Sequence, residues 1–214
     1  MTFAQPLPFG DTVIERAQDK GLLFILVGPA GVGKNTIMNE AIARLPRLCQ
    51  LPTVTTRSPR PTEQEGREHF FVSRDKFDQL LHNGDLIESQ EVHPGKFYGT
   101  PRKPTQIALE ADSLLIADID ILGAKAIQAA FPHHVVLIFI EPPSMDVLAE
   151  RIRRREHGNM PEDEIAKRLD RARFELSHAG EFEYRVVNDK LEDAVDATLA
   201  IINRAIHERE RKQA

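Results

Sequence analysis

The feature that most constrains the fold is a glycine-rich run that directly follows an apolar segment. Leu22 to Val27 are six consecutive apolar residues, a pattern typical of a strand buried on both faces of a parallel sheet. The next residues are Gly28-Pro29-Ala30-Gly31-Val32-Gly33-Lys34-Asn35-Thr36, and a helical period begins at Lys34. Glycines permit positive φ angles and close approach, so successive backbone N–H groups can surround phosphate oxygens at a helix N-terminus while Lys34 neutralises their charge. The sequence therefore predicts a phosphate-binding loop between a strand and a helix.

The residue after Lys34 departs from the common form of this motif. A Ser or Thr hydroxyl normally contacts Mg²⁺ at this position, whereas this chain has Asn35. The amide oxygen of Asn35 could bind the ion directly or through water, and Thr36 could play a supporting part. The motif predicts a nucleotide bound with Mg²⁺. The presence of Asn35 in place of Ser or Thr is expected to alter the affinity for this metal.

Apolar runs and helical periods alternate along most of the chain. Two further runs have the pattern of buried strands, Ser113 to Ile119 and His134 to Ile140. Helical periods fall at Lys34 to Leu45, Ile121 to Ala130, Ser144 to Arg155, Pro161 to Ser177 and Leu191 to Glu208. Strands that alternate with helices predict an α/β fold with a parallel sheet, formed here by residues 21–50 and 101–214.

Other stretches fall outside this alternation. Residues 51–100 combine β-like pieces at 53–55, 69–72 and 86–92 with a helical period at 74–82, so we expect an inserted α+β lobe. Residues 1–20 are expected to be an N-terminal extension with a short helix at 11–20. From about Arg153 the sequence is rich in charge and is followed by Gly158 and Pro161, which predicts a loop between helices.

Charge and composition exclude several classes of protein. A net charge of −5 argues against a broad electrostatic grip on nucleic acid. The longest uncharged apolar stretch, Gly21 to Val32, is shorter than the roughly 17–25 residues that span a bilayer, and no signal-peptide pattern is present, so we expect no membrane partner and a cytoplasmic location. Cys49 is the single cysteine, which excludes an internal disulfide and predicts a small buried side chain.

A second group of residues suits another phosphate. Thr55-Thr56-Arg57-Ser58-Pro59-Arg60 is followed by Glu63, Gly66, Glu68 and His69. Two arginines three residues apart beside a proline-stiffened turn can bind phosphate through their guanidinium forks. Taken alone, the same pattern is also what solvated surface arginines produce, and Glu88 alone could be the polar face of a strand.

Several motifs together resemble those of guanylate kinases. They are Gly28 to Thr36, Thr55 to Arg60 with Glu63 and Gly66, Phe97-Tyr98-Gly99-Thr100-Pro101, Asp118-Ile119-Asp120 with Gly123-Ala124, Glu141-Pro142-Pro143-Ser144, Arg168-Leu169 with Ala172, Glu175 and Leu176, and Val187-Asn188-Asp189. The resemblance covers about residues 22 to 205. It implies a P-loop three-layer α/β fold with a parallel sheet, a nucleoside-monophosphate (NMP) binding lobe at 51–100 and a short lid at 153–164.

The resemblance also implies roles for individual residues in the transfer of the ATP γ-phosphoryl group to GMP. ATP would bind at Gly28, Ala30, Gly31, Val32, Gly33, Lys34, Asn35, Thr36 and Asn188, with Asn188 near the base. GMP would bind at Thr53, Arg57, Arg60, His69, Glu88, Tyr98, Thr100 and Asp120, with Glu88 and Thr100 on the guanine edge. His69 stands where the family usually has a Tyr that contacts the acceptor phosphate.

The remaining implied roles concern the transferred phosphoryl group. Lys34, Arg155 and Arg168 are the expected catalytic residues, and Mg²⁺ is the expected cofactor, held near Asn35 and, through water, by Asp118. Arg151, Arg153 and Arg154 are interpreted as a solvated helix face. The assembly is expected to be a monomer or a homodimer.

Two alternatives stay open at this point. Asn35 and His69 also fit ribose 1,5-bisphosphate phosphokinase, a related enzyme, although Arg60, Glu63, Gly66, Glu88, Asp118 and Asp120 follow the guanylate kinase pattern. A non-catalytic module that binds protein partners would typically lack the loop lysine and glycines, which this chain retains.

Overall fold

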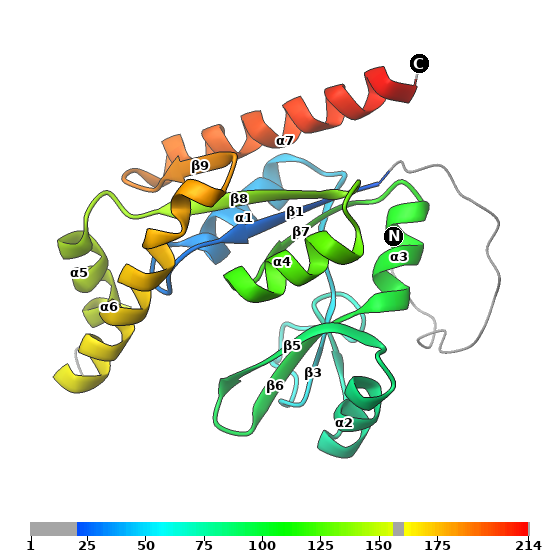
Figure 1. Cartoon of the computed structure of the whole chain (residues 1–214), viewed down its shortest axis with the longest axis horizontal. Coiled ribbons are helices and arrows are strands. Elements are labelled where there is room, and N and C mark those ends of the chain that lie inside the picture. Colours follow the sequence, from blue (N-terminus) through cyan, green and yellow to red (C-terminus); the bar gives the residue numbers. More distant parts are fainter. Residues whose placement is uncertain (1–20, 156–160, 214) are drawn as a thin grey trace. The chain divides into compact units, whose positions relative to one another are not determined.

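The computed structural model describes residues 21–155 and 161–213, and the helix expected at 11–20 lies outside them. Its strands are β1 (Leu22–Val27), β2 (Leu48–Gln50), β3 (Thr53–Thr55), β4 (His69–Phe71), β5 (Leu86–His93), β6 (Lys96–Pro101), β7 (Leu114–Asp118), β8 (Val135–Glu141) and β9 (Tyr184–Val187) (Figure 1). Its α-helices are α1 (Lys34–Arg44), α2 (Arg74–His82), α3 (Arg102–Glu110), α4 (Ile121–Ala130), α5 (Met145–Arg155), α6 (Glu162–Ser177) and α7 (Leu191–Gln213). The predicted α/β class is confirmed.

The larger sheet contains the strand that precedes the glycine-rich run. Its five strands are ordered β2-β7-β1-β8-β9, and β8 and β9 pair in parallel with Ile138 opposite Tyr184 and Glu141 opposite Val187. All six side chains of β1 are buried, which explains why this strand is apolar without alternation. The chain leaves β1 at Val27 and enters α1 at Lys34, so the glycine-rich run is the turn between them.

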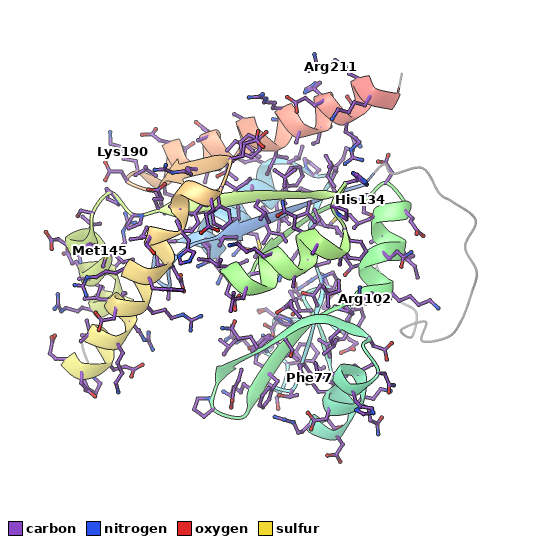
Figure 2. The ribbon with its side chains drawn as sticks, in the orientation of Figure 1. Phe77, Arg102, His134, Met145, Lys190 and Arg211 are labelled. Carbon is purple, nitrogen blue, oxygen red and sulfur yellow. The ribbon has the colours of Figure 1, made fainter. Side chains whose placement is uncertain are left out.

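The second sheet is mixed and is built from the predicted inserted segment. Its order is β4-β3-β6-β5, in which β3 pairs parallel with β4 and β6 pairs antiparallel with both β3 and β5. Helix α2 packs on β5, and its residues Phe77 and Leu80 join Val54, Phe70 and Leu86 in one buried cluster (Figure 2). The amphipathic pattern of α2 therefore supplies the core beneath this sheet.

The chain divides into two compact units. The unit that contains the second sheet, called here the lobe unit, comprises Arg47–Leu115, Lys125–Val135 and residues 21–23. The other, called here the loop unit, comprises Phe24–Pro46, Ile116–Ala124 and Val136–Ala214. Within the loop unit α7 packs against α1 and β9, and α5 packs against α6 (Figure 1).

Three sequence-based expectations differ from the structure. Cys49 is exposed, because it belongs to the three-residue strand β2 in which only Leu48 is buried. Helix α5 continues through Arg155 and α6 begins at Glu162, so the loop expected from Arg153 is helical at 153–155; residues 156–160 lie outside the described part. The last helix extends to Gln213, beyond the expected end at Glu208, because charged residues continue the helix where the apolar period stops.

The lobe unit should depend on Phe77 for stability. Its side chain is 1% exposed, and Phe77→Ala should lower the free energy of unfolding by about 3–5 kcal/mol, the usual cost of removing a buried aromatic ring. Leu81→Ala on the same helix is the matched control, since Leu81 is 47% exposed and should change stability by about 0.5 kcal/mol or less. Urea unfolding followed by circular dichroism measures both, and equal losses would contradict the assigned core.

Candidate active site

The phosphate loop, residues Gly28 to Thr36, needs glycine at three positions. Gly28, Gly31 and Gly33 have φ angles of 138°, 87° and 102°. A Cβ on Gly31 would lie 2.9 Å from Cγ1 of Ile152, and one on Gly28 would collide with the carbonyl oxygen of Ile140. Backbone conformation and packing thus both exclude side chains, as the sequence pattern predicted.

The start of α1 is open to an anion. Gly33 precedes the helix in the left-handed conformation, no side chain caps the helix, and its first turn contains no acidic residue. The first N–H groups of a helix lack intrahelical partners and lie at the positive end of its dipole. Asn35 and Thr36 are exposed in this first turn. Phosphate oxygens could therefore accept hydrogen bonds from the backbone here.

Lys34 folds back over the loop that precedes it. Its Nζ donates to the carbonyl oxygens of Gly28 at 2.5 Å and Pro29 at 3.2 Å, and it lies 3.5 Å from Oδ1 of Asp118. Its side chain is 11% exposed. The ammonium group is thus held at the mouth of the phosphate loop, where it can meet a polyphosphate without a large reorganisation.

Asp118, the last residue of β7, and Asp120, which follows this strand, have different surroundings. Asp118 faces Lys34, as given above, whereas Oδ1 of Asp120 accepts a hydrogen bond from the backbone N–H of Gly123 at 2.8 Å. Asp120 therefore caps the start of α4. Its expected contact with guanine stays a prediction.

Asn188 contacts the phosphate loop, and Arg151 contacts the backbone of Asn188. Asn188 is 6% exposed, and its Nδ2 donates to the carbonyl oxygen of Val32 at 2.7 Å. Arg151 donates from Nη1 to the carbonyl oxygen of Asn188 at 2.9 Å and from Nη2 to that of Asp189 at 3.2 Å. The interpretation of Arg151 as part of a solvated helix face is therefore wrong, because its guanidinium group binds backbone carbonyls.

Arg155 and Arg168 are the two arginines that the resemblance assigned to the transferred phosphoryl group. Arg155 is the last residue of α5, and its side chain lies outside the described part of the chain. Arg168 is about one-third exposed on α6, and its Nε lies 3.5 Å from Oε1 of Glu164. Both catalytic roles stay predictions.

The lobe unit places Tyr98, a predicted acceptor residue, and Glu63 against Arg57. The guanidinium group of Arg57 donates to both carboxylate oxygens of Glu63, from Nη1 at 2.6 Å and from Nη2 at 2.5 Å, while Nε donates to the hydroxyl of Tyr98 at 2.8 Å. The carboxylate and the phenol thus fix two edges of the guanidinium plane. The Arg57 side chain is only 9% exposed, so it cannot rotate freely as a surface arginine would.

These bonds keep Glu63 ionised at a lower pH than an ordinary carboxyl group. The guanidinium of Arg57 and the backbone N–H of Arg60, which donates at 2.8 Å, lower the pKa of Glu63 to about 2 from its usual 4.5. The hydrogen bond to Glu63 in turn raises the pKa of Arg57. The side chain of Arg60 itself is exposed. Glu63 thus orients one arginine of the pair and fixes the backbone of the other.

His69 and Thr53 complete this group on adjacent strands. Thr53 stands opposite His69 in the β3–β4 pair, and Oγ1 of Thr53 lies 2.7 Å from Nδ1 of His69. The imidazole ring stands edge-on to the ring of Tyr98, with centroids 5.7 Å apart. Burial, followed by the positive charge of Arg57, lowers the pKa of His69 from its usual value, so the ring is neutral at neutral pH.

A β-bulge brings Glu88 beside Thr100. Leu86 pairs with Pro101 and Ser89 pairs with Gly99, so Ile87 and Glu88 together oppose Thr100. The buried hydroxyl of Thr100 donates to Oε1 of Glu88 at 2.7 Å. The structure therefore brings together the two residues that the resemblance assigned to the guanine edge.

Two residues of these groups were given no role by sequence reasoning. Glu63 had a usable signal, since it is the first carboxylate after two arginines within a short turn-rich segment. Arg151 had none, because three neighbouring arginines carry the same charge and only the three-dimensional structure shows which one meets residues 188 and 189.

The described residues contain neither a cluster of metal-ligating side chains nor a helix suited to a membrane. Within 21–155 and 161–213, no three His, Cys, Asp or Glu side chains converge as a metal site. None of the helices in these ranges has the length and apolar character needed to cross a membrane.

Comparison with known proteins gives a consistent result. The guanylate kinase family model matches residues 20–205. A guanylate kinase of Trichormus variabilis is 43% identical over 177 residues, which cover 83% of this chain and 87% of that protein. A guanylate kinase of Granulibacter bethesdensis is 41% identical over 193 residues, or 90% of this chain and 89% of that protein.

A solved structure agrees with these relatives. The crystal structure of guanylate kinase from Anaplasma phagocytophilum superposes with a TM-score of 0.66 at 32% identity and covers 87% of each chain. Because the family model matches most of the chain and the relatives share most of their length with it, this chain belongs to the guanylate kinase family.

Proposed function

We propose that the chain transfers the γ-phosphoryl group of ATP to GMP and so produces ADP and GDP. Membership of the guanylate kinase family supports this reaction. The observation that carries it is the hydrogen bond between Thr100 and Glu88, because it prepares a carboxylate for the base of the acceptor. An acceptor without a purine base would have no use for that pair.

ATP binds through its phosphates to the loop unit. The backbone N–H groups of the phosphate loop and the first turn of α1 hold the phosphate oxygens, and Lys34 approaches the β- and γ-phosphates. The carbonyl oxygens of Gly28 and Pro29 keep its ammonium group close to this position before the nucleotide arrives. This arrangement reduces the reorganisation required when charge develops on the transferred group.

The phosphate of GMP binds to the group around Arg57. Glu63 occupies one edge of the guanidinium plane, and the edge formed by Nε and Nη2 faces the hydroxyl of Tyr98. A phosphate beside Tyr98 would accept one hydrogen bond from the remaining N–H of Nη2 and another from the hydroxyl of Tyr98, whose oxygen already accepts from Nε. Exposed Arg60 and neutral His69 add donors from the same loop and strand.

The base of GMP is recognised by Glu88 and Thr100. A carboxylate offers about four lone-pair positions, so the bond from Thr100 does not saturate it. Guanine presents its N1–H and 2-amino group side by side, whereas adenine offers no N1–H donor. A site built on such bonds rejects an analogue that lacks them, because the half-buried carboxylate of Glu88 would lose the two donors of the base.

Catalysis depends on alignment and on charge neutralisation. Phosphoryl transfer demands little covalent chemistry from the protein, so no general base is assigned. Mg²⁺, when bound with ATP, neutralises and orients the phosphate oxygens. Asn35, exposed in the first turn of α1, and Asp118, close to Lys34, are oxygen-bearing residues suited to its coordination shell directly or through water. Arg155 and Arg168 are proposed to approach the transferred group.

The choice of GMP as acceptor and the role of Glu88 in recognising its base can be tested in one assay. GMP should be phosphorylated faster than dGMP, IMP, AMP or ribose 1,5-bisphosphate, and Glu88→Gln should reduce the preference for GMP over AMP by about ten- to a hundredfold, because one acceptor oxygen becomes a donor. A coupled assay of ADP release measures both. Faster turnover of AMP or ribose 1,5-bisphosphate by the wild type would refute the proposed acceptor, and an unchanged GMP:AMP ratio would remove Glu88 from base recognition.

Lys34→Ala should lower kcat by at least about 10²–10³-fold, by comparison with removal of a single oxyanion-hole donor. The fold should persist, since this side chain contacts loop carbonyls and not the apolar core. Lys212→Ala, at the exposed end of α7, is the control and should keep wild-type kcat. Thermal unfolding checks that both variants are folded, and a folded Lys34→Ala variant with most of its activity would refute the role of Lys34.

Asn35→Ser should lower the Mg²⁺ concentration that gives half-maximal rate. A hydroxyl and an amide oxygen are both hard ligands, but they reach different distances from the helix backbone, and Mg²⁺ demands a near-octahedral shell. The choice of acceptor should not change. A Mg²⁺ titration at saturating ATP and GMP measures the midpoints of both proteins, and identical midpoints would place Asn35 outside the metal shell.

A further inference from the structure

The amide of Asn188 contacts the phosphate loop at the peptide that links Val32 to Gly33. Nδ2 of Asn188 donates to the carbonyl oxygen of Val32 at 2.7 Å, and both residues are buried. The backbone of Asn188 is itself fixed, since its N–H donates to the carbonyl oxygen of Glu141 at 2.8 Å and continues the β8–β9 pairing. The amide therefore reaches the loop from a rigid strand end.

The contact between Asn188 and the Val32 carbonyl also determines where the N–H of Gly33 points. The carbonyl of Val32 and the N–H of Gly33 belong to one trans peptide plane, so they point in opposite directions. A donor that holds the Val32 carbonyl on one side directs the Gly33 N–H to the other side. That N–H belongs to the glycine-rich run whose backbone donors suit phosphate oxygens.

Gly33 fits against the same amide. It has a φ of 102°, and a Cβ at this position would collide with Nδ2 of Asn188. The absence of a side chain at Gly33 is thus what allows Asn188 to approach the loop closely.

Arg151 connects this contact to α5. Its two terminal nitrogens donate to the carbonyl oxygens of Asn188 and Asp189, at 2.9 and 3.2 Å. The next residue of α5, Ile152, packs against Gly31 of the loop. One turn of α5 therefore supports the loop both directly and through the backbone of residues 188 and 189.

We propose that Asn188 and Arg151 are positioning residues that orient the Val32–Gly33 peptide towards the phosphates of the donor nucleotide. This differs from the base contact that the family resemblance implies for Asn188. The proposal rests on the proposed function only for the identity of the donor, ATP. It requires no statement about the acceptor.

Inorganic tripolyphosphate separates the two roles because it has no base. Asn188→Ala should weaken tripolyphosphate binding about fivefold or more, raise KM for ATP by a similar factor and leave KM for GMP within about twofold. Displacement of a fluorescent ATP analogue and isothermal titration measure binding without turnover. Unchanged affinity for tripolyphosphate with weakened affinity for ATP would overturn the proposal in favour of a base contact.

Variants of Arg151 keep the proposal testable if Asn188→Ala does not fold. Arg151→Met should weaken tripolyphosphate binding as Asn188→Ala does. Arg151→Lys should recover part of the affinity, because the single ammonium group of lysine can bind one of the two carbonyl oxygens but not both in the geometry of the guanidinium group. Arg185→Met is the matched control: this exposed arginine of β9 pairs with Glu141, and its loss should change affinity by less than about twofold.

The outcomes distinguish this proposal from the proposed function. Wild-type affinity for tripolyphosphate in folded Arg151→Met would overturn the positioning role of Arg151. Failure of GMP to act as acceptor would refute the proposed function but would leave the tripolyphosphate measurements as they are, since these contain no acceptor.

Discussion

The close packing around the phosphate loop is the constraint on which the rest of the loop unit depends. Gly28 lies against β8, Gly31 against α5 and Gly33 against Asn188, so three separate elements fix one short turn. A turn fixed in this way has its N–H groups already arranged for an anion, which lowers the cost of reorganisation during binding and reaction. Lys34 follows the same rule, because loop carbonyls hold its ammonium group in place before any phosphate arrives.

In the lobe unit, hydrogen bonds fix the orientation of a charged side chain, Arg57, in the absence of a ligand. An arginine intended for a phosphate dianion has to keep its orientation when the phosphate is absent, although the side chain has many rotamers. Glu63 provides this orientation through two hydrogen bonds, and Tyr98 holds the neighbouring edge of the guanidinium plane. Since the pKa of Glu63 is about 2, the carboxylate is charged at any pH at which an enzyme of this kind is assayed. The orientation of Arg57 is therefore independent of pH in that range.

Sequence patterns could predict the elements that have a clear apolar period or a glycine-rich motif. Strand β1, the phosphate loop and α1 follow from six apolar residues, three glycines and a lysine, and α2 and β3 were placed at their observed bounds. Strands β2, β6 and β9 and helix α3 were not predicted, because the strands are short or partly exposed and α3 follows β6 without an intervening turn signal. The contact of Arg151 with residues 188 and 189 joins positions 37 and 38 residues apart, and no local pattern encodes such a distance.

Asn35 and His69 depart from the family pattern, and the structure shows what surrounds each of them. Asn35 is exposed in the first turn of α1, so its substitution alters an outer contact of the loop and leaves the packing beneath it intact. His69 replaces a tyrosine, which is neutral at neutral pH, and the lowered pKa of His69 makes the imidazole neutral as well. The positive charge for the proposed acceptor phosphate thus still rests on Arg57 and Arg60, as the proposed function requires. What changes is the hydrogen bonding: Nδ1 of His69 lies 2.7 Å from Oγ1 of Thr53 on the adjacent strand, while Nε2 lies 3.9 Å from Oε1 of Glu63, too far for a hydrogen bond.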